Sequence, residues 1–186
     1  MYSSKFCLFI FLLFLRNNIT EAQLINQVSD SLSSQQKRDR LLGLSIGFAA
    51  GYTTGMILLH QAWYKYDDRT SFHFFNDNSH WNQMDKAGHF WAAYHQSRLG
   101  VDMLKWAGVK EKKAIIYGSL VGILFQTPIE IFDGFSEEYG ASLGDMAANT
   151  LGSAGVFAQQ LLWGELRIFQ NFPFIPLNIP PQGFKC

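Results

Sequence analysis

Three short stretches decide the fold of this chain: DKAGHFWAAY (85–94), PIEIFDG (128–134) and LGDMAANTLGSAG (143–155). Each sets charged or amide side chains against apolar, glycine-rich sequence. An ionised group inside an apolar helix costs several kcal/mol unless it finds a partner, so we expect the three stretches to meet in one site. The residues expected in this polar cluster are Asp85, Lys86, His89, Glu130, Asp133, Asp145 and Asn149.

Helical periodicity gives each stretch one polar face. Residues three, four and seven apart lie on the same side of a helix, so Asp85 projects with His89, and Asp145 with Asn149. The two acids of the second stretch are three residues apart and also share a face. The sequence therefore predicts polar stripes that face one another inside an otherwise apolar helical assembly.

Composition bounds the class of protein. The 186 residues carry 15 basic and 15 acidic side chains, and a charged fraction of 16% is well below the roughly 25% of an ordinary soluble domain. This balance makes nucleic acid an unsuitable partner. Hydrophobic residues make up 48% and aromatic residues 16%, which favours contact with membrane lipid. The mean hydropathy near zero argues against a fully embedded transporter.

The first 22 residues are typical of a secretory signal peptide. Lys5 precedes an apolar run, 6–15, and the small residues Thr20 and Ala22 suit cleavage before Gln23. The other interpretation is an uncleaved N-terminal anchor. Cys7 lies inside the apolar run with no small residue directly before it, so it is not expected to be lipidated. After cleavage one cysteine would remain, at the last position, and no internal disulfide is expected.

The rest of the chain is predicted to be all-α: a small bundle of hydrophobic, glycine-rich helices, embedded in a membrane or associated with one. We expect a polar leader at 23–40, the helical domain at 41–170 and an irregular, proline-rich tail at 171–186. Within the domain, a helix from Asp85 to about Trp106 is expected to break or bend near Gly100. A second helix from Ala114 is expected to bend or end at Pro128, just before the acids of the second stretch.

The segment 41–59 has no charged residue and is long enough to span a bilayer. Its glycines recur every fourth residue and form a smooth strip on which another backbone could pack. We expect an intrachain contact there rather than an envelope protein partner or a second copy of the chain. The residues of this strip are Gly43, Gly47, Gly51 and Gly55.

The charges before this segment conflict with a cleaved signal. After cleavage, Lys37, Arg38 and Arg40 would flank the span on the outer side of the membrane, whereas basic residues prefer the cytoplasmic side. Either the signal remains as an anchor, or 41–59 is a buried or surface-associated helix of an envelope protein.

The region 85–163 resembles the YfiM-like family of predicted periplasmic or envelope lipoproteins and, more distantly, the VanZ-like small membrane proteins. The resemblance implies an exported helical protein of the bacterial cell envelope with no assigned biochemical activity, and VanZ-like members are linked to altered glycopeptide-antibiotic susceptibility. It supplies no catalytic residue. The residues that carry it are Asp85, Lys86, His89 and Tyr94, then Glu130, Asp133 and Gly134, then Gly144, Asp145, Asn149 and Gly152.

Two interpretations of the polar cluster follow, and the first is favoured. In the first, Lys86 or His89 neutralises the acids, and the cluster is a structural network or a ligand-binding notch. In the second, a metal-dependent hydrolase acts on a lipid or cell-wall precursor phosphate, with a divalent metal as its cofactor. No HExxH, Gly-x-Ser-x-Gly or phosphate-cradling motif supports an enzyme. The residues that could bind the metal are Asp85, His89, Glu130, Asp133 and Asp145.

Overall fold

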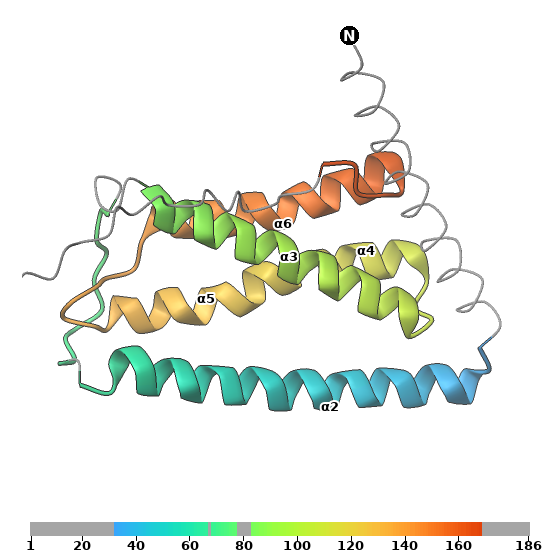
Figure 1. Ribbon diagram of the computed structural model, residues 1–186, viewed down its shortest axis with the longest axis horizontal. Helices are drawn as coiled ribbons and strands as arrows, with labels where there is room; N and C mark the ends of the chain where they lie inside the picture. Colours follow the sequence, from blue (N-terminus) through green and yellow to red (C-terminus); the bar gives the residue numbers. More distant parts are fainter. Residues whose placement is uncertain (1–31, 67, 78–82, 169–186) are drawn as a thin grey trace, which may run out of the picture.

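The computed structural model describes residues 32–66, 68–77 and 83–168. Over these ranges the chain is helical, with two isolated β-bridges in its connections, and the predicted all-α bundle is confirmed (Figure 1). The signal segment, both cysteines and the tail at 171–186 lie outside the described residues. The helices are α2 (Ser34–Leu59), continued by the π-helical turn η1 (His60–Tyr64), then α3 (Met84–Trp106), α4 (Glu111–Ser119), α5 (Val121–Gly134) and α6 (Leu143–Trp163).

Helix α2 begins inside the segment expected as a polar leader because a capping box starts it there. The hydroxyl of Ser33 accepts from the backbone N–H of Gln36 at 3.2 Å, and the Gln36 side chain accepts from the Ser33 N–H at 2.9 Å. The two bonds satisfy amide groups that a helix start leaves without partners. Helix α2 then runs the whole length of the molecule, beside the bundle formed by α3, α4, α5 and α6 (Figure 1).

Helix α3 is the centre of this bundle and packs against α4, α5 and α6. The break predicted as one outcome near Gly100 is wrong, since α3 is continuous from Met84 to Trp106. The glycine serves close packing instead. A Cβ built on Gly100 would lie 2.6 Å from the backbone oxygen of Gly118 in α4, a distance that real side chains do not reach.

The helix does not end at Pro128 either, which was one of the two outcomes that the sequence predicts there. Pro128 lies inside α5, which continues to Gly134, and the break falls at Leu120, between α4 and α5. The Ser97 side chain of α3 explains this position. Its hydroxyl donates to the Ser119 carbonyl at 2.8 Å and accepts from the Gly122 N–H at 3.2 Å, so it bonds backbone groups on both sides of the break.

The four glycines of α2 do not make the intrachain contact that we expected. A Cβ built on any of them would meet nothing within 4 Å. Aromatic and cationic side chains join α2 to the bundle instead: the ring of Tyr52 stacks on Phe125 with centroids 4.6 Å apart, and the Arg40 guanidinium lies 4.5 Å from the Trp106 ring. These long side chains hold the two backbones apart and leave an apolar groove of about 700 Å³ between them.

Polarity is inverted in the bundle. On α6 the buried side chains include Asp145, Asn149 and Ser153, whereas Leu151 and Leu161 are about 60% exposed. The same holds more widely among the described residues, where the buried apolar side chains are mostly alanine and valine and the large apolar ones lie outside. The buried polar residues are Ser97, Ser119, Gln126, Glu130, Ser136, Ser142, Asp145, Asn149, Ser153, Gln159 and Gln160.

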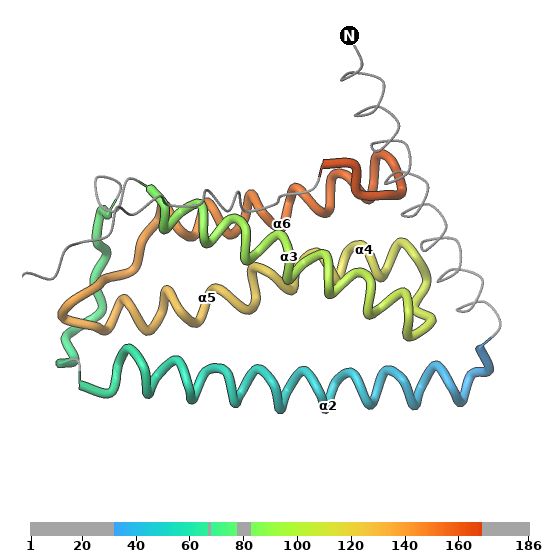
Figure 2. Tube along the Cα trace, in the orientation of Figure 1, coloured from blue at the N-terminus to red at the C-terminus, as the bar shows by residue number. Residues whose placement is uncertain are grey.

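Charge is separated along the length of the bundle. At one end, which we call the basic end, α2 begins, α3 ends, α4 begins and α6 ends, as the tube in Figure 2 shows. Eight basic and three acidic described residues lie there. At the opposite, acidic end, η1 and α5 finish and α3 and α6 begin, with eight acidic and three basic residues. The remaining charged pair, Arg98 and Asp102, lies one turn apart on α3 with 3.7 Å between Nε and Oδ2.

The basic end consists of Lys37, Arg38, Arg40, Lys105, Lys110, Lys112, Lys113 and Arg167, with Asp39, Glu111 and Glu165. The acidic end consists of Asp68, Asp77, Asp85, Glu130, Asp133, Glu137, Glu138 and Asp145, with Lys65, Arg69 and Lys86.

Candidate functional site

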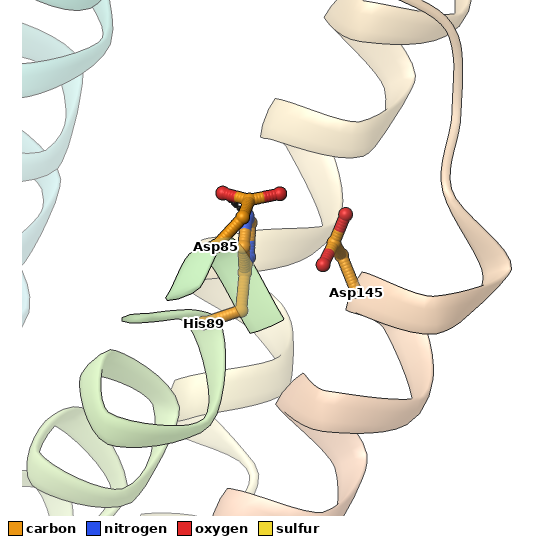
Figure 3. Close-up of side chains that lie close together, drawn as sticks. All are labelled: Asp85, His89 and Asp145. Carbon is orange, nitrogen blue, oxygen red and sulfur yellow. Dashed lines mark ion pairs between the residues drawn. The ribbon is translucent and has the colours of Figure 1, made fainter. Parts of the chain in front are cut away.

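The residues predicted as a polar cluster come together at the acidic end. They project from the first turns of α3, the last turns of α5 and the first two turns of α6. Figure 3 shows three of them, Asp85 and His89 on α3 and Asp145 on α6, with their side chains turned toward one another. The cluster has two halves, one centred on Lys86 and one on His89.

The lysine half is a closed network. The Nζ atom of Lys86 lies 2.7 Å from Asp77 Oδ2 and 3.2 Å from Asp145 Oδ1. Ser142 caps α6: its hydroxyl accepts from the Asp145 N–H at 3.1 Å and donates to Asp77 Oδ1 at 2.8 Å. Burial acts to raise the pKa of Asp77, but the hydrogen bonds from Lys86 and Ser142 outweigh it, and this pKa lies at about 2. Asp77 is therefore ionised at neutral pH and pairs with the lysine.

The histidine half is more open. The Nδ1 atom of His89 lies 3.2 Å from Asn149 Oδ1 and 3.7 Å from Glu130 Oε1. On the other side of the ring, Nε2 lies 3.7 Å from Asp85 Oδ1. The Asp85 side chain is 46% exposed, so this half of the cluster is accessible from solvent.

Glu130 is the least satisfied member of the cluster. Its Oε2 atom accepts from the Ser142 N–H at 3.0 Å, which joins α5 to the start of α6. Its Oε1 atom is buried and makes no hydrogen bond with any described residue. The whole residue is 3% exposed. A buried carboxylate oxygen without a donor is rare in folded proteins and calls for a positive charge or a ligand.

Of the five residues considered as metal ligands, three form a compact group. One ligand atom each from Asp85, His89 and Asp145 lie within 4.8 Å of one another. Glu130 is on the Nδ1 side of the histidine ring. Asp133 accepts a hydrogen bond from the Tyr64 hydroxyl of η1, which anchors the end of the long α2–η1 helix to α5.

Three participants were not predicted from the sequence: Asp77, Ser142 and Tyr64. Ser142 had a local signal, because a serine three residues before an acid at a helix start is a capping pattern. Asp77 lies in a turn-rich connection and Tyr64 in an aromatic one, where nothing in the local pattern indicates a distant partner.

Comparison with protein families bears on this region. Residues 73–160 match the model of a family described as predicted periplasmic lipoprotein (DUF2279). The matched range contains all seven residues predicted for the cluster. No curated protein and no solved structure matches the chain. The match supports an exported, lipoprotein-like protein of the cell envelope.

Proposed function

We propose that this chain is an integral membrane protein of the bacterial cell envelope, and that its polar cluster is a ligand-binding site facing the periplasm. Four helical segments would cross the bilayer. The first is α2 continued by η1, the second is α3, the third is α4 followed by α5, and the fourth is α6. The single observation that carries the proposal is the inverted polarity of α6, which turns its polar residues into the bundle and its large apolar residues outward.

Water and lipid favour opposite arrangements of a helix. In water, a helix lowers its free energy by burying leucine and phenylalanine, and in hydrocarbon it does so by burying its amide and carboxylate groups. Helix α6 follows the second rule, since Leu151, Phe157 and Leu161 face out while Asn149 and Gln159 are buried. Its length of 21 residues corresponds to about 32 Å, close to the ~30 Å of a bilayer core.

Hydropathy alone detects two candidate spans, Ser34–Tyr64 and Glu111–Gly134. Hydropathy does not detect α6 because its inward-facing asparagine and glutamines lower the mean hydropathy of the helix, although these side chains would not face lipid. The residue-by-residue orientation therefore supports a span that composition misses. Exposed aromatic residues lie at both ends of the bundle, where the lipid headgroups would be, as is usual in membrane proteins. Examples are Trp63 and Phe74 at the acidic end and Trp106 and Trp163 at the basic end.

The charge separation supports an orientation. Basic residues near spans favour the cytoplasmic side, so the basic end would be cytoplasmic and the acidic end periplasmic. The beginning of α2 then lies on the cytoplasmic side, which favours the interpretation that the leader is not cleaved. The likeness of the cluster motifs to YfiM-like and VanZ-like proteins agrees with an envelope location.

The two halves of the cluster support different roles. The lysine half has its charges paired and joins α3, α6 and the connection before α3, so a structural role accounts for it. The histidine half has a half-exposed acid and a buried carboxylate oxygen without a donor, which favours ligand binding. A metal-dependent hydrolase acting on a lipid or cell-wall precursor phosphate is the alternative, and it would depend on the same half.

Cysteine accessibility in whole cells tests this arrangement. In a chain with Cys7 and Cys186 replaced by serine, Glu138→Cys is expected to react with a membrane-impermeant maleimide applied from outside. Lys112→Cys should react only after the cells are opened, because it belongs to the basic end. Leu151→Cys should stay unreactive in both conditions, since lipid covers the middle of α6.

The pattern of labelling decides the proposal. If Leu151→Cys reacts as fast as Glu138→Cys in intact cells, α6 faces water and the membrane assignment fails. If Lys112→Cys reacts from outside while Glu138→Cys does not, the helices cross the bilayer in the opposite direction and the site is not periplasmic. Alkaline extraction of the membrane fraction supplies a control for loose attachment.

A further inference from the structure

We infer that the histidine half of the cluster, together with Asp145 of the lysine half, binds a divalent first-row transition-metal ion, with Asp85, His89 and Asp145 as its protein ligands. The inference deepens the proposed function and rests on it for the role of the site. The three residues place one imidazole nitrogen and two carboxylate oxygens within 4.8 Å of one another, on two helices that the lysine network already holds together (Figure 3).

The hydrogen bonds of His89 suit a metal ligand. Nδ1 lies beside two acceptors, Asn149 Oδ1 at 3.2 Å and Glu130 Oε1 at 3.7 Å, so the proton of a neutral ring belongs on Nδ1. The lone pair is then on Nε2, the nitrogen nearer to Asp85. Histidines that bind metals usually donate their other N–H to a carboxylate or carbonyl, which fixes the ring and raises its basicity.

Glu130 provides an independent indication. Its Oε1 atom is buried, lacks a hydrogen-bond donor and points to the histidine ring. With a metal on Nε2, the Nδ1–H group is more strongly polarised, and the bare carboxylate oxygen gains the positive partner that it otherwise lacks. Glu130 is thus a positioning residue, and not one of the three ligands.

Charge balance leads to the same conclusion. The cluster contains five carboxylates, from Asp77, Asp85, Glu130, Asp133 and Asp145, and Lys86 is its one lysine or arginine. The ammonium of Lys86 is shared between Asp77 and Asp145. A divalent cation between Asp85 and Asp145 would offset the negative charges of these two ligands, so binding would relieve the repulsion between them.

The donor set indicates the class of metal. Calcium prefers six to eight oxygen ligands, whereas a histidine with two carboxylates suits Mn²⁺, Fe²⁺ or Zn²⁺. Three protein ligands leave coordination positions for water or for a ligand oxygen. The half-exposed Asp85 lies on the side from which such a molecule could enter.

Binding of Mn²⁺ and Zn²⁺ to the purified full chain in detergent micelles tests the inference. We expect saturable binding of one ion per chain by isothermal titration calorimetry. Asp85→Asn should weaken it at least ~10-fold, because a ligand charge is lost. Asp102→Asn is the matched control: Asp102 is on the same helix, is similarly exposed at 45% and pairs with a base one turn away, and its replacement should leave the affinity unchanged.

A spectroscopic measurement separates metal ligation from a merely structural role. Pulsed electron paramagnetic resonance of the Mn²⁺-loaded chain should detect coupling to a histidine nitrogen, and His89→Gln should abolish it. The inference is overturned if the folded wild type shows no saturable binding, if Asp85→Asn binds as well as Asp102→Asn, or if nitrogen coupling is missing. Because maleimide labelling does not depend on metal, loss of the metal site would leave the membrane arrangement standing and would remove the metal, and the metal-dependent hydrolase with it, from the histidine half.

Discussion

Replacement of Lys86 by alanine is expected to lower the free energy of unfolding by about 3–5 kcal/mol, the usual cost of removing one partner from a buried ion pair. The side chain of Lys86 is 13% exposed and that of Asp145 4% exposed. Without the ammonium, Asp145 and Asp77 would be neighbouring carboxylates with no cation between them. Thermal and denaturant unfolding in detergent, followed by circular dichroism, measures the loss.

Lys105→Ala is the matched control for this prediction. Lys105 is on the same helix and is equally buried, at 12%, but its acidic partner Glu111 is 53% exposed. Water can solvate Glu111 after the change, so the ion pair should contribute no more than about 1 kcal/mol, and the hydrogen bond that Lys105 donates to buried Gln160 Oε1 at 3.0 Å should contribute about 1 kcal/mol more. Equal losses for the two lysine variants would show that burial of the acidic partner is not what stabilises the acidic end.

Replacement of Gly122 by alanine is expected to cost at least ~3 kcal/mol, at the upper end of the range for overpacking. A Cβ at this position would lie 2.2 Å from the backbone oxygen of Ala93 and 2.6 Å from the hydroxyl of Ser97. The nearest atom belongs to a backbone, which cannot rotate away, so α5 would have to move from α3. Gly152→Ala should behave alike, because its Cβ would lie 2.3 Å from the Phe90 carbonyl oxygen.

Gly88→Ala provides the contrast. Gly88 is also inside α3, but a Cβ there meets nothing within 4 Å. Alanine should therefore leave stability unchanged or raise it by roughly 0.5–1 kcal/mol through helix propensity. Unfolding temperatures of the three variants measure the difference. Tolerance of Gly122→Ala equal to that of Gly88→Ala would rule out the close approach of α3 and α5.

The membership of the site could be read largely from local sequence. Ionisable residues in apolar helices need partners, and helical spacing places Asp85 with His89 and Asp145 with Asn149. The pairing itself could not be read in this way. Lys86 bonds Asp77, an aspartate of the connection before α3, and Asp133 bonds Tyr64 of η1. Which acid meets which base depends on how the helices lie across one another.

The position of the helix break also depends on tertiary structure and not on local sequence alone. Pro128 is the strongest local breaker in 111–134, yet α5 passes through it, because the packing of α5 on α3 and α6 offsets a local cost of about 3 kcal/mol. The chain breaks at Leu120, where the Ser97 hydroxyl from another helix bonds the freed backbone groups. No sequence pattern within 111–134 predicts that a serine from α3 bonds the backbone at this position.

By itself, the sequence determined the helical class, the shortage of charge outside the polar cluster and the seven residues gathered at the acidic end, since these follow from spacing of three to four residues and from the cost of an unpaired charge. Only the tertiary structure decided which faces point inward, because a glutamine on α6 lowers the hydropathy of the helix whether it faces lipid or the neighbouring helix. It also decided that Asp85, His89 and Asp145, and not all five candidate ligands, lie close enough to share an ion, because a distance between helices depends on where glycine lets their backbones approach.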